Sequence, residues 1–177
     1  RLPASMNQVE YFGRGPAENY LDRNAGSMVG LYKSTAEELY FPYVRPQENG
    51  HHTDTRWVSL STGKKGLLIQ ADNTIGFNAL RNSIEDFDDE EATGLSRQWS
   101  NFTPEQVANH DEAAAKNVLR RQHHINNITP RDFVEVCVDL KQQGVAGYDS
   151  WGSRPEPAYT LPANREYNWG FTLIPLK

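Results

Sequence analysis

Short stretches in which apolar and polar residues alternate, each ended by glycine, proline or asparagine, recur along most of this chain. A period of two is typical of strands that bury one face, and such strands at regular spacing indicate an antiparallel β-sandwich. An α/β domain would need helical patterns between the strands, and these are nearly absent. The pattern predicts strands at residues 9–12, 28–34, 57–61, 67–71, 133–140 and 169–174, with a hairpin turn at 62–66.

One short helix is also predicted. Thr103 supplies an N-cap residue, Pro104 the first helical position and Gln106 the third, so the helix should end near Asn109 or His110. Residues 111–119 contain three consecutive alanines but no wide apolar stripe, so they favour a helix less.

Composition narrows the class of protein. The chain has 177 residues, enough for one compact core, and a net charge of -5 with no clearly basic face, which argues against a nucleic-acid partner. We interpret the short basic group at 120–124 as a solvated patch. No apolar run is long enough to cross a membrane. Cys137 is the only cysteine, so no disulfide can form within the chain. Because the chain begins at Arg1 rather than Met, we expect it to be part of a longer protein.

An acidic run at residues 85–91 could suggest a calcium loop. The spacing and turn glycine of an EF-hand are missing, so a solvated loop is the preferred interpretation.

Three clusters hold the residues that could carry chemistry. In the first, residues 13–23 (GRGPAENYLDR), the Gly-x-Gly pair lacks the third glycine of a phosphate cradle, and Pro16 follows at once. A rigid turn is the better interpretation, with ion pairs among its charged side chains: Arg14, Glu18, Asp22 and Arg23.

The second cluster, residues 43–57, concentrates hydroxyl, amide, carboxylate, imidazole and guanidinium groups, which are groups that read sugars. His51 and His52 should point to opposite faces of a strand, and too few other ligands are present for zinc, so no metal site is predicted. A structural loop remains an alternative for this cluster.

The third cluster is the loop GYDSWGSRP at residues 147–155, in which Trp151 stands among glycine, serine and aspartate. An exposed indole is a good platform for a pyranose ring, because it buries apolar area against the sugar. The alternative is a tryptophan that covers the edge of the sandwich.

At these clusters the chain resembles the small, C-terminal domain of family-two β-galactosidases. The matching stretches are VEYFGRGPAENYLDR at 9–23, YVRPQENG at 43–50 running into TRW, and GYDSWGSRP at 147–155, followed by a terminal WGFTLIP strand. They occur in the family's order with comparable spacing and span nearly the whole chain.

The resemblance implies a large antiparallel β-sandwich, a supersandwich similar to galactose mutarotase. Residues 1–177 would form its C-terminal portion, as a partial domain with one short helix. The family's domain has further strands before the segment that begins at Val9, so we expect exposed sheet edges. These would pair with the missing segment or with a second copy in a homo-oligomer.

The resemblance also implies a retaining β-galactosidase that hydrolyses terminal β-D-galactosides, with two catalytic glutamates on a separate barrel. No residue here matches those glutamates, so this chain has no catalytic residue and should be inactive in isolation. Trp151 matches the tryptophan with which the family's small domain reaches the sugar pocket. Arg45, Glu48 and Asn49 lie in the loop near that pocket and are further candidates for substrate binding or loop positioning.

The implied partners are the barrel and the other domains of the parent chain, and a galactoside substrate. No cofactor is expected in this chain, although the parent enzyme could use Mg²⁺ or Na⁺ in its barrel. The sequence leaves the compartment open between bacterial cytoplasm and periplasm.

Three alternatives to this function remain. A free-standing carbohydrate-binding module would share the sandwich and the aromatic platform. A mutarotase-like epimerase would need an acid and a base, for which His52 and Glu48 could be imagined. A purely structural domain would fit everything except a direct role for Trp151.

Overall fold

The computed structural model describes residues 1–87, 125, 128–149 and 151–177, and these fall into two compact units. The first unit comprises residues 1–41, 49–81 and 131–177, and the second comprises 42–48 and 82–130. The short helix predicted at 103–110, the weaker one at 111–119 and the basic group at 120–124 lie outside the described residues.

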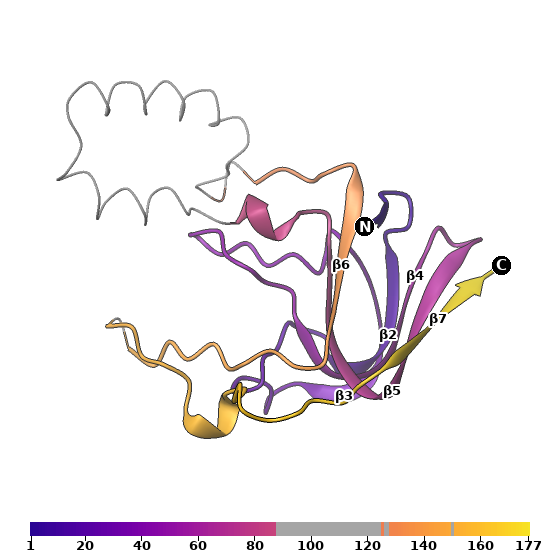
Figure 1. The fold of residues 1–177 in the computed structure, drawn as a ribbon. Helices are drawn as coiled ribbons and strands as arrows, with labels where there is room; N and C mark the ends of the chain where they lie inside the picture. The colour runs from indigo at the N-terminus through magenta and orange to yellow at the C-terminus, as the bar shows by residue number, and fades with distance from the viewer. Residues whose placement is uncertain (88–124, 126–127, 150) are drawn as a thin grey trace, which may run out of the picture. The chain divides into compact units, whose positions relative to one another are not determined.

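The first unit is all-β and antiparallel, as predicted, and is consistent with a β-sandwich (Figure 1). Its described residues form a seven-stranded sheet in the order β1-β6-β5-β4-β2-β3, and β7 also pairs with β5. The strands are β1 Leu2–Pro3, β2 Gln8–Gly15, β3 Met28–Thr35, β4 His52–Ser61, β5 Gly66–Leu80, β6 Phe133–Asp139 and β7 Phe171–Leu176.

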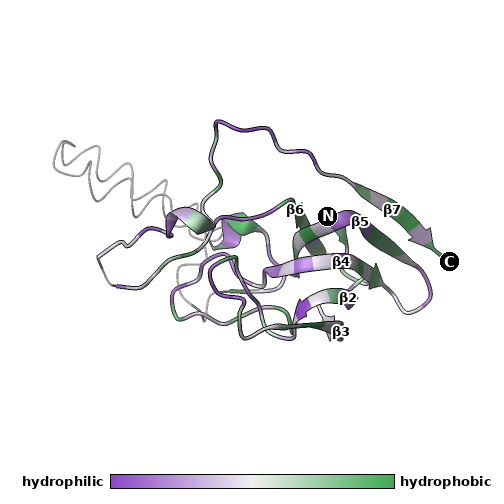
Figure 2. Cartoon of the chain, turned by 90° about the horizontal axis from the view of Figure 1, so that it is seen from below, coloured by the Kyte–Doolittle hydropathy of each residue, from purple (hydrophilic) through white to green (hydrophobic). Residues whose placement is uncertain are grey.

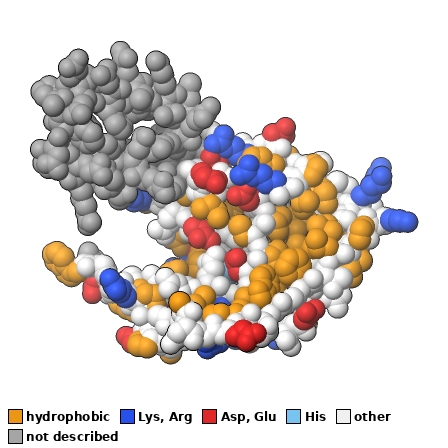
Figure 3. All heavy atoms as spheres, in the orientation of Figure 1, with side chains coloured by type: hydrophobic (Ala, Val, Ile, Leu, Met, Phe, Trp, Pro, Cys, Tyr) orange, Lys and Arg blue, Asp and Glu red, His pale blue; other side chains and the backbone are white. Residues whose placement is uncertain are grey.

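Alternation explains which face of the central strands is buried. On β2, Val9 and Tyr11 lie opposite Leu60 and Val58 of β4, and all four are at most 2% exposed. The residues between them on β2 and β4 face the other side, where Phe12 is opposite Trp57. Figure 2 shows the resulting changes of hydropathy along the strands, and Figure 3 shows hydrophobic side chains gathered over part of the surface.

The hairpin turn between β4 and β5 is confirmed. The amide of Thr62 donates to the carbonyl of Lys65 at 2.8 Å, and Gly63 has a φ of 82°, which glycine adopts without a steric penalty.

Several boundaries differ from the sequence prediction. β4 begins at His52 rather than at Trp57, β7 spans Phe171–Leu176 rather than 169–174, and the short β1 was not predicted. β2 continues through Gly13 to Gly15, because those glycines lie against neighbouring side chains and have no bulk of their own. β5 runs to Leu80 rather than stopping at Ala71 and pairs with three other strands, β4, β6 and β7.

The described residues include two 3-10 turns, at Ile84–Asp86 in the second unit and Pro157–Tyr159 in the first. The first of these corrects the solvated-loop interpretation of the acidic run at Asp86, while Glu85 is exposed as expected. Asp86 is only 1% exposed, and its carboxylate accepts the amide proton of Ser83 at 3.0 Å. Residues 88–91 of the run lie outside the described residues.

Candidate functional site

The first sequence cluster leaves the end of β2 and forms a loop that holds the second cluster in place. Asn19 is fully buried, and its side-chain oxygen accepts the amide of Thr53 at 3.0 Å and the hydroxyl of Thr53 at 2.6 Å. Its side-chain nitrogen donates to the carbonyls of Arg14 and Ala17, each at 3.1 Å. The Asn19 side chain therefore ties two turns of the chain together.

Glu18 adds a second tie to the same region. Its carboxylate accepts the amide of Gly50 at 2.7 Å and pairs with the guanidinium of Arg23 at 2.6 Å. The predicted ion pair between Glu18 and Arg23 is thus confirmed. Arg14, near the end of β2, instead pairs with Asp54 of β4 at 2.5 Å, so this ion pair links two neighbouring strands.

Asp22, in the same loop, bonds to the backbone just before the third cluster. Its Oδ1 accepts the amide of Val145 at 3.0 Å, and its Oδ2 accepts the amide of Ala146 at 2.8 Å. Asp22 therefore contributes charge-assisted hydrogen bonds to backbone rather than the expected ion pair.

The loop that carries Trp151 leaves β6 and returns toward β7, and its own residues hold its shape. The amide of Gly144 donates to the carbonyl of Tyr159 at 2.7 Å, which closes the base of the loop. Nearer the tip, the amide of Tyr148 donates to the hydroxyl of Ser153 at 3.0 Å. The amide of Trp151 donates to the Asp149 carboxylate at 2.7 Å.

The side chain of Trp151 is 93% exposed. Its indole does not cover the edge of the sandwich, which was the competing interpretation. Tyr148, on the same loop, is also exposed, and its pKa is raised, first by desolvation and then by the negative charge of Asp22. The loop therefore presents an aromatic surface in this chain.

The two histidines of the second cluster are both buried, at 0% and 1% exposed. The Nδ1 of His52 lies 2.9 Å from the carbonyl of Gly50, and its Nε2 lies 3.2 Å from the carbonyl of Pro16. A neutral imidazole can donate to one of these carbonyls at a time. Desolvation lowers the pKa of His52, which favours that neutral form. His52 is thus enclosed by backbone carbonyls and by the rings of Tyr11 and Phe77, and it has no open face toward a substrate.

Neither ring nitrogen of His51 has a hydrogen-bond partner among the described residues. The ring stacks on Tyr20 with centroids 5.6 Å apart and lies against Gly76, where a Cβ atom would approach it to 2.4 Å. Desolvation, and secondly the neighbouring His52, lower the pKa of His51 to about 4. The ring is therefore neutral at physiological pH.

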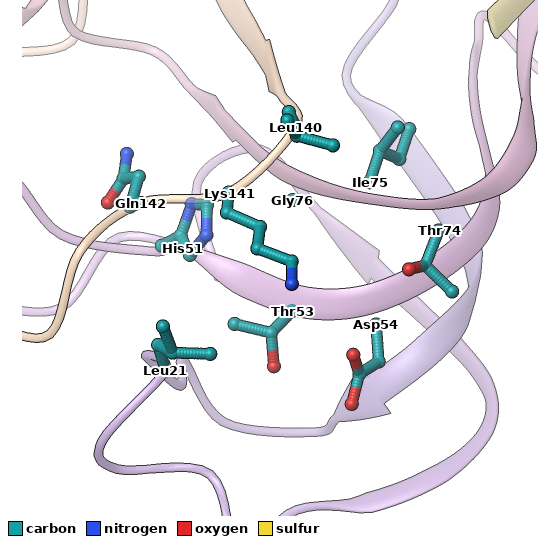
Figure 4. Close-up of a pocket in the computed structure, with 10 residues that line it drawn as sticks. All are labelled: Leu21, His51, Thr53, Asp54, Thr74, Ile75, Gly76, Leu140, Lys141 and Gln142. Atoms are coloured by element: carbon teal, nitrogen blue, oxygen red, sulfur yellow. The ribbon is translucent and has the colours of Figure 1, made fainter. Parts of the chain in front are cut away.

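His51 borders a small cavity of about 70 Å³ in the first unit. Figure 4 shows the residues that line it, among them His51 and Lys141. The volume is enough for a few water molecules and too small for a hexose.

The remaining candidates of the second cluster separate by burial. Asn49, in the first unit, is 1% exposed, and its side-chain oxygen accepts the amide of Phe41 at 2.9 Å, which favours a role in shaping the loop. Arg45 and Glu48, in the second unit, are exposed.

Across residues 1–87, 125, 128–149 and 151–177, no group of three or more His, Cys, Asp or Glu side chains could hold a metal ion. Within the same residues, no helix is long and apolar enough to span a bilayer.

Sequence reasoning missed the roles of Asn19 and Asp22 as anchors for distant backbone. The available signal was that Asn and Asp within a Gly- and Pro-containing loop readily hydrogen-bond to backbone groups. That signal does not identify which backbone they reach, because their partners are 34 and 123 or more residues away.

Comparison with known proteins assigns a family. The family described as the β-galactosidase small chain matches residues 1–173. A β-galactosidase of Priestia megaterium is 34% identical over 99% of this chain. β-Galactosidases of Streptococcus thermophilus and Staphylococcus xylosus are 28% and 26% identical over 99% and 97% of it. The chain spans 14% of the length of each of these three proteins. This chain belongs to the β-galactosidase small-chain family.

Proposed function

We propose that this chain is a non-catalytic, C-terminal part of a retaining β-galactosidase and that Trp151 forms one wall of the sugar pocket. The enzyme would hydrolyse terminal β-D-galactosides with two carboxyl groups on a barrel domain. One carboxyl group protonates the leaving oxygen, and the other attacks the anomeric carbon to give a covalent intermediate that water releases. Any Mg²⁺ or Na⁺ that assists this reaction would belong to the barrel.

The observation that carries the proposal is the exposure of Trp151, at 93%, on a loop of a chain in this family. Leaving an indole in water is unfavourable, and contact with the C–H face of a pyranose recovers that free energy. The chain's partners would then be the barrel, the other domains of the parent chain and the galactoside, with pairing to a second copy at open sheet edges.

Replacing Trp151 with alanine in the full-length enzyme tests this role. We expect the substitution to weaken substrate and acceptor binding by about 1–3 kcal/mol, because one stacking face is lost. Steady-state kinetics with lactose, and the ratio of transfer to hydrolysis with an added alcohol acceptor, would measure the effect. Trp151→Phe should restore part of the binding.

The matched control is Trp169→Ala, which removes a half-exposed indole that lies next to Phe171 with ring centroids 5.6 Å apart. It should leave the Michaelis constant and acceptor preference unchanged. An unaltered Michaelis constant and acceptor preference in Trp151→Ala would remove Trp151 from the site.

A carbohydrate-binding module is the second candidate, and a feature of the sheet favours it. A shallow hollow of about 360 Å³ on the outer face of β4 and its neighbours is lined by residues that include Trp57, Glu10 and Gln70. An indole with carboxylate and amide groups beside it could also bind a sugar. Saturable quenching of tryptophan fluorescence by lactose in the isolated chain would favour the module over the main proposal.

The enclosure of His52 disfavours the mutarotase-like alternative, because an acid or base in that reaction must face the sugar. Polarimetry on fresh α-galactose would detect such an activity.

A further inference from the structure

We propose that Asp22 is a positioning residue for Trp151, acting through two hydrogen bonds to the backbone at the start of the tryptophan loop. The inference rests on the proposed function, because it assigns to Asp22 an effect on sugar binding that Trp151 delivers.

Both carboxylate oxygens of Asp22 are committed to the loop. Oδ1 accepts from Val145 at 3.0 Å and Oδ2 from Ala146 at 2.8 Å. Gly144 makes this approach possible, since a Cβ atom there would lie 2.5 Å from Oδ2 of Asp22. Because the amides of two consecutive residues both donate to Asp22, they fix the position and the direction of the chain at this point.

The backbone beyond these amides has a conformation that needs support. Ala146 has a φ of 55° and Gly147 a φ of 80°, so two consecutive residues are in the left-handed region. That region is disfavoured for alanine, and such residues persist where the surroundings enforce them. The bond from Ala146 to Asp22 is well placed to enforce it, and the left-handed pair sets the direction of the backbone where the Trp151 loop begins.

Asp22 is itself held rigidly. The amide and carbonyl of Tyr20 bond to the carbonyl and amide of Arg23, at 3.3 and 2.8 Å, so Asp22 lies inside a closed turn. Tyr20 is 4% exposed and anchors that turn in the core. The hydrogen bonds near the tip of the loop join loop residues to one another, whereas Asp22 reaches the loop from 123 residues earlier in the chain.

The test uses the full-length enzyme with Asp22→Asn, Trp151→Ala and the double variant. Asparagine has the shape of aspartate but turns one acceptor into a donor, so it loses one of the two backbone bonds. We expect the Michaelis constant for lactose to rise about threefold to tenfold in Asp22→Asn, with little change in kcat. In the Trp151→Ala background, Asp22→Asn should change the Michaelis constant by less than about twofold, because Asp22 acts through the indole.

Hydrogen exchange provides a readout that does not depend on activity. The amides of Val145 and Ala146 should exchange faster in Asp22→Asn, while those of β2 and β4 keep their protection. Asp132→Asn, at an exposed position, is the matched control and should alter neither exchange nor kinetics.

Two failures can be told apart. If Trp151→Ala leaves sugar binding intact, the proposed function fails. If Trp151→Ala weakens binding but Asp22→Asn does not, or if Asp22→Asn acts equally in both backgrounds, the positioning role of Asp22 is wrong while the role of Trp151 stands.

Discussion

The loop at residues 16–23 forms hydrogen bonds to two regions of this chain. One of these regions is buried, and the other is exposed to solvent. Glu18 and Asn19 accept hydrogen bonds from the segment 49–55. Within this segment the side chains of His51, His52 and Thr55 are at most 1% exposed. Asp22 accepts two hydrogen bonds from the start of the Trp151 loop, and this loop exposes Trp151 to solvent.

The comparison shows that richness in polar and aromatic residues does not by itself mark a binding surface. The sequence of the second cluster offers more groups that could bind a sugar, but Asn19 bonds to the amide and hydroxyl of Thr53, and several other polar side chains of the cluster are buried: Asn49, His51, His52 and Thr55. The third cluster has fewer such groups and leaves its largest side chain in solvent. Stability should therefore depend on the first region, and recognition on the second.

The largest expected effect is on the buried region. Asn19→Ala removes four hydrogen bonds and should lower the free energy of unfolding by about 4 kcal/mol, at a net value near 1 kcal/mol for each bond. Hydrogen exchange of the peptide covering 49–55, in the full-length protein, would measure the local loss. Asn164→Ala, at an exposed position, should have no effect. Equal protection in the two variants would contradict the central role of Asn19.

The second largest expected effect is on how the stability of the folded chain depends on pH. Burial lowers the pKa of His51 from 6.5 to about 4, so between these values the unfolded chain takes up a proton that the folded chain does not. Stability should be complete above pH 6.5 and fall by about 3 kcal/mol as the pH drops to 4 and below.

His51→Leu isolates this contribution. Because neither ring nitrogen has a partner among the described residues, leucine should cost little at pH 7.5 and should reduce the loss in acid. Denaturant midpoints of the two proteins between pH 4.5 and 7.5 would give the difference. Parallel pH profiles would mean that His51 does not titrate as its burial implies.

The smallest effect should be on the exposed loop. Trp151→Ala should change the free energy of unfolding by less than about 0.5 kcal/mol, because a side chain that is 93% exposed loses little burial. The denaturant midpoint of the variant would test this. A destabilisation near that of Asn19→Ala would mean that the indole packs inside the protein and would remove the distinction between the two regions.

Much of the sheet was predictable because its strands alternate cleanly, as β2 and β4 do where Val9 and Tyr11 oppose Leu60 and Val58. The full length of β5 was not predictable. Its middle residues, Asp72 to Thr74, are polar and look like a loop, and their place in a strand depends on pairing with chain segments far away. Asp54, with a φ of 51° beside a register shift in β4, likewise gives no local signal of its irregularity.

The candidate site divides in the same way. The exposure of a tryptophan in a glycine-rich loop could be expected from its neighbours, but the burial of His51, His52 and Asn49 could not. Burial is decided by what packs over a segment, and here the packing comes from a turn about 30 residues earlier. Asp22 could not be connected to the Trp151 loop, because hydrogen bonds between distant segments leave no periodic trace.

β5 has a consequence for how such a chain can change over time. β6 pairs with one end of this strand and β7 with the other, so the chain between β6 and β7 is an excursion that leaves β5 and returns to it. Insertions, deletions or new aromatic residues within that excursion need not disturb the pairing on either side. A lineage could thus change the side chains that the Trp151 loop presents while inheriting the sheet unchanged, provided that the carboxylate at position 22 still bonds to the amides of Val145 and Ala146.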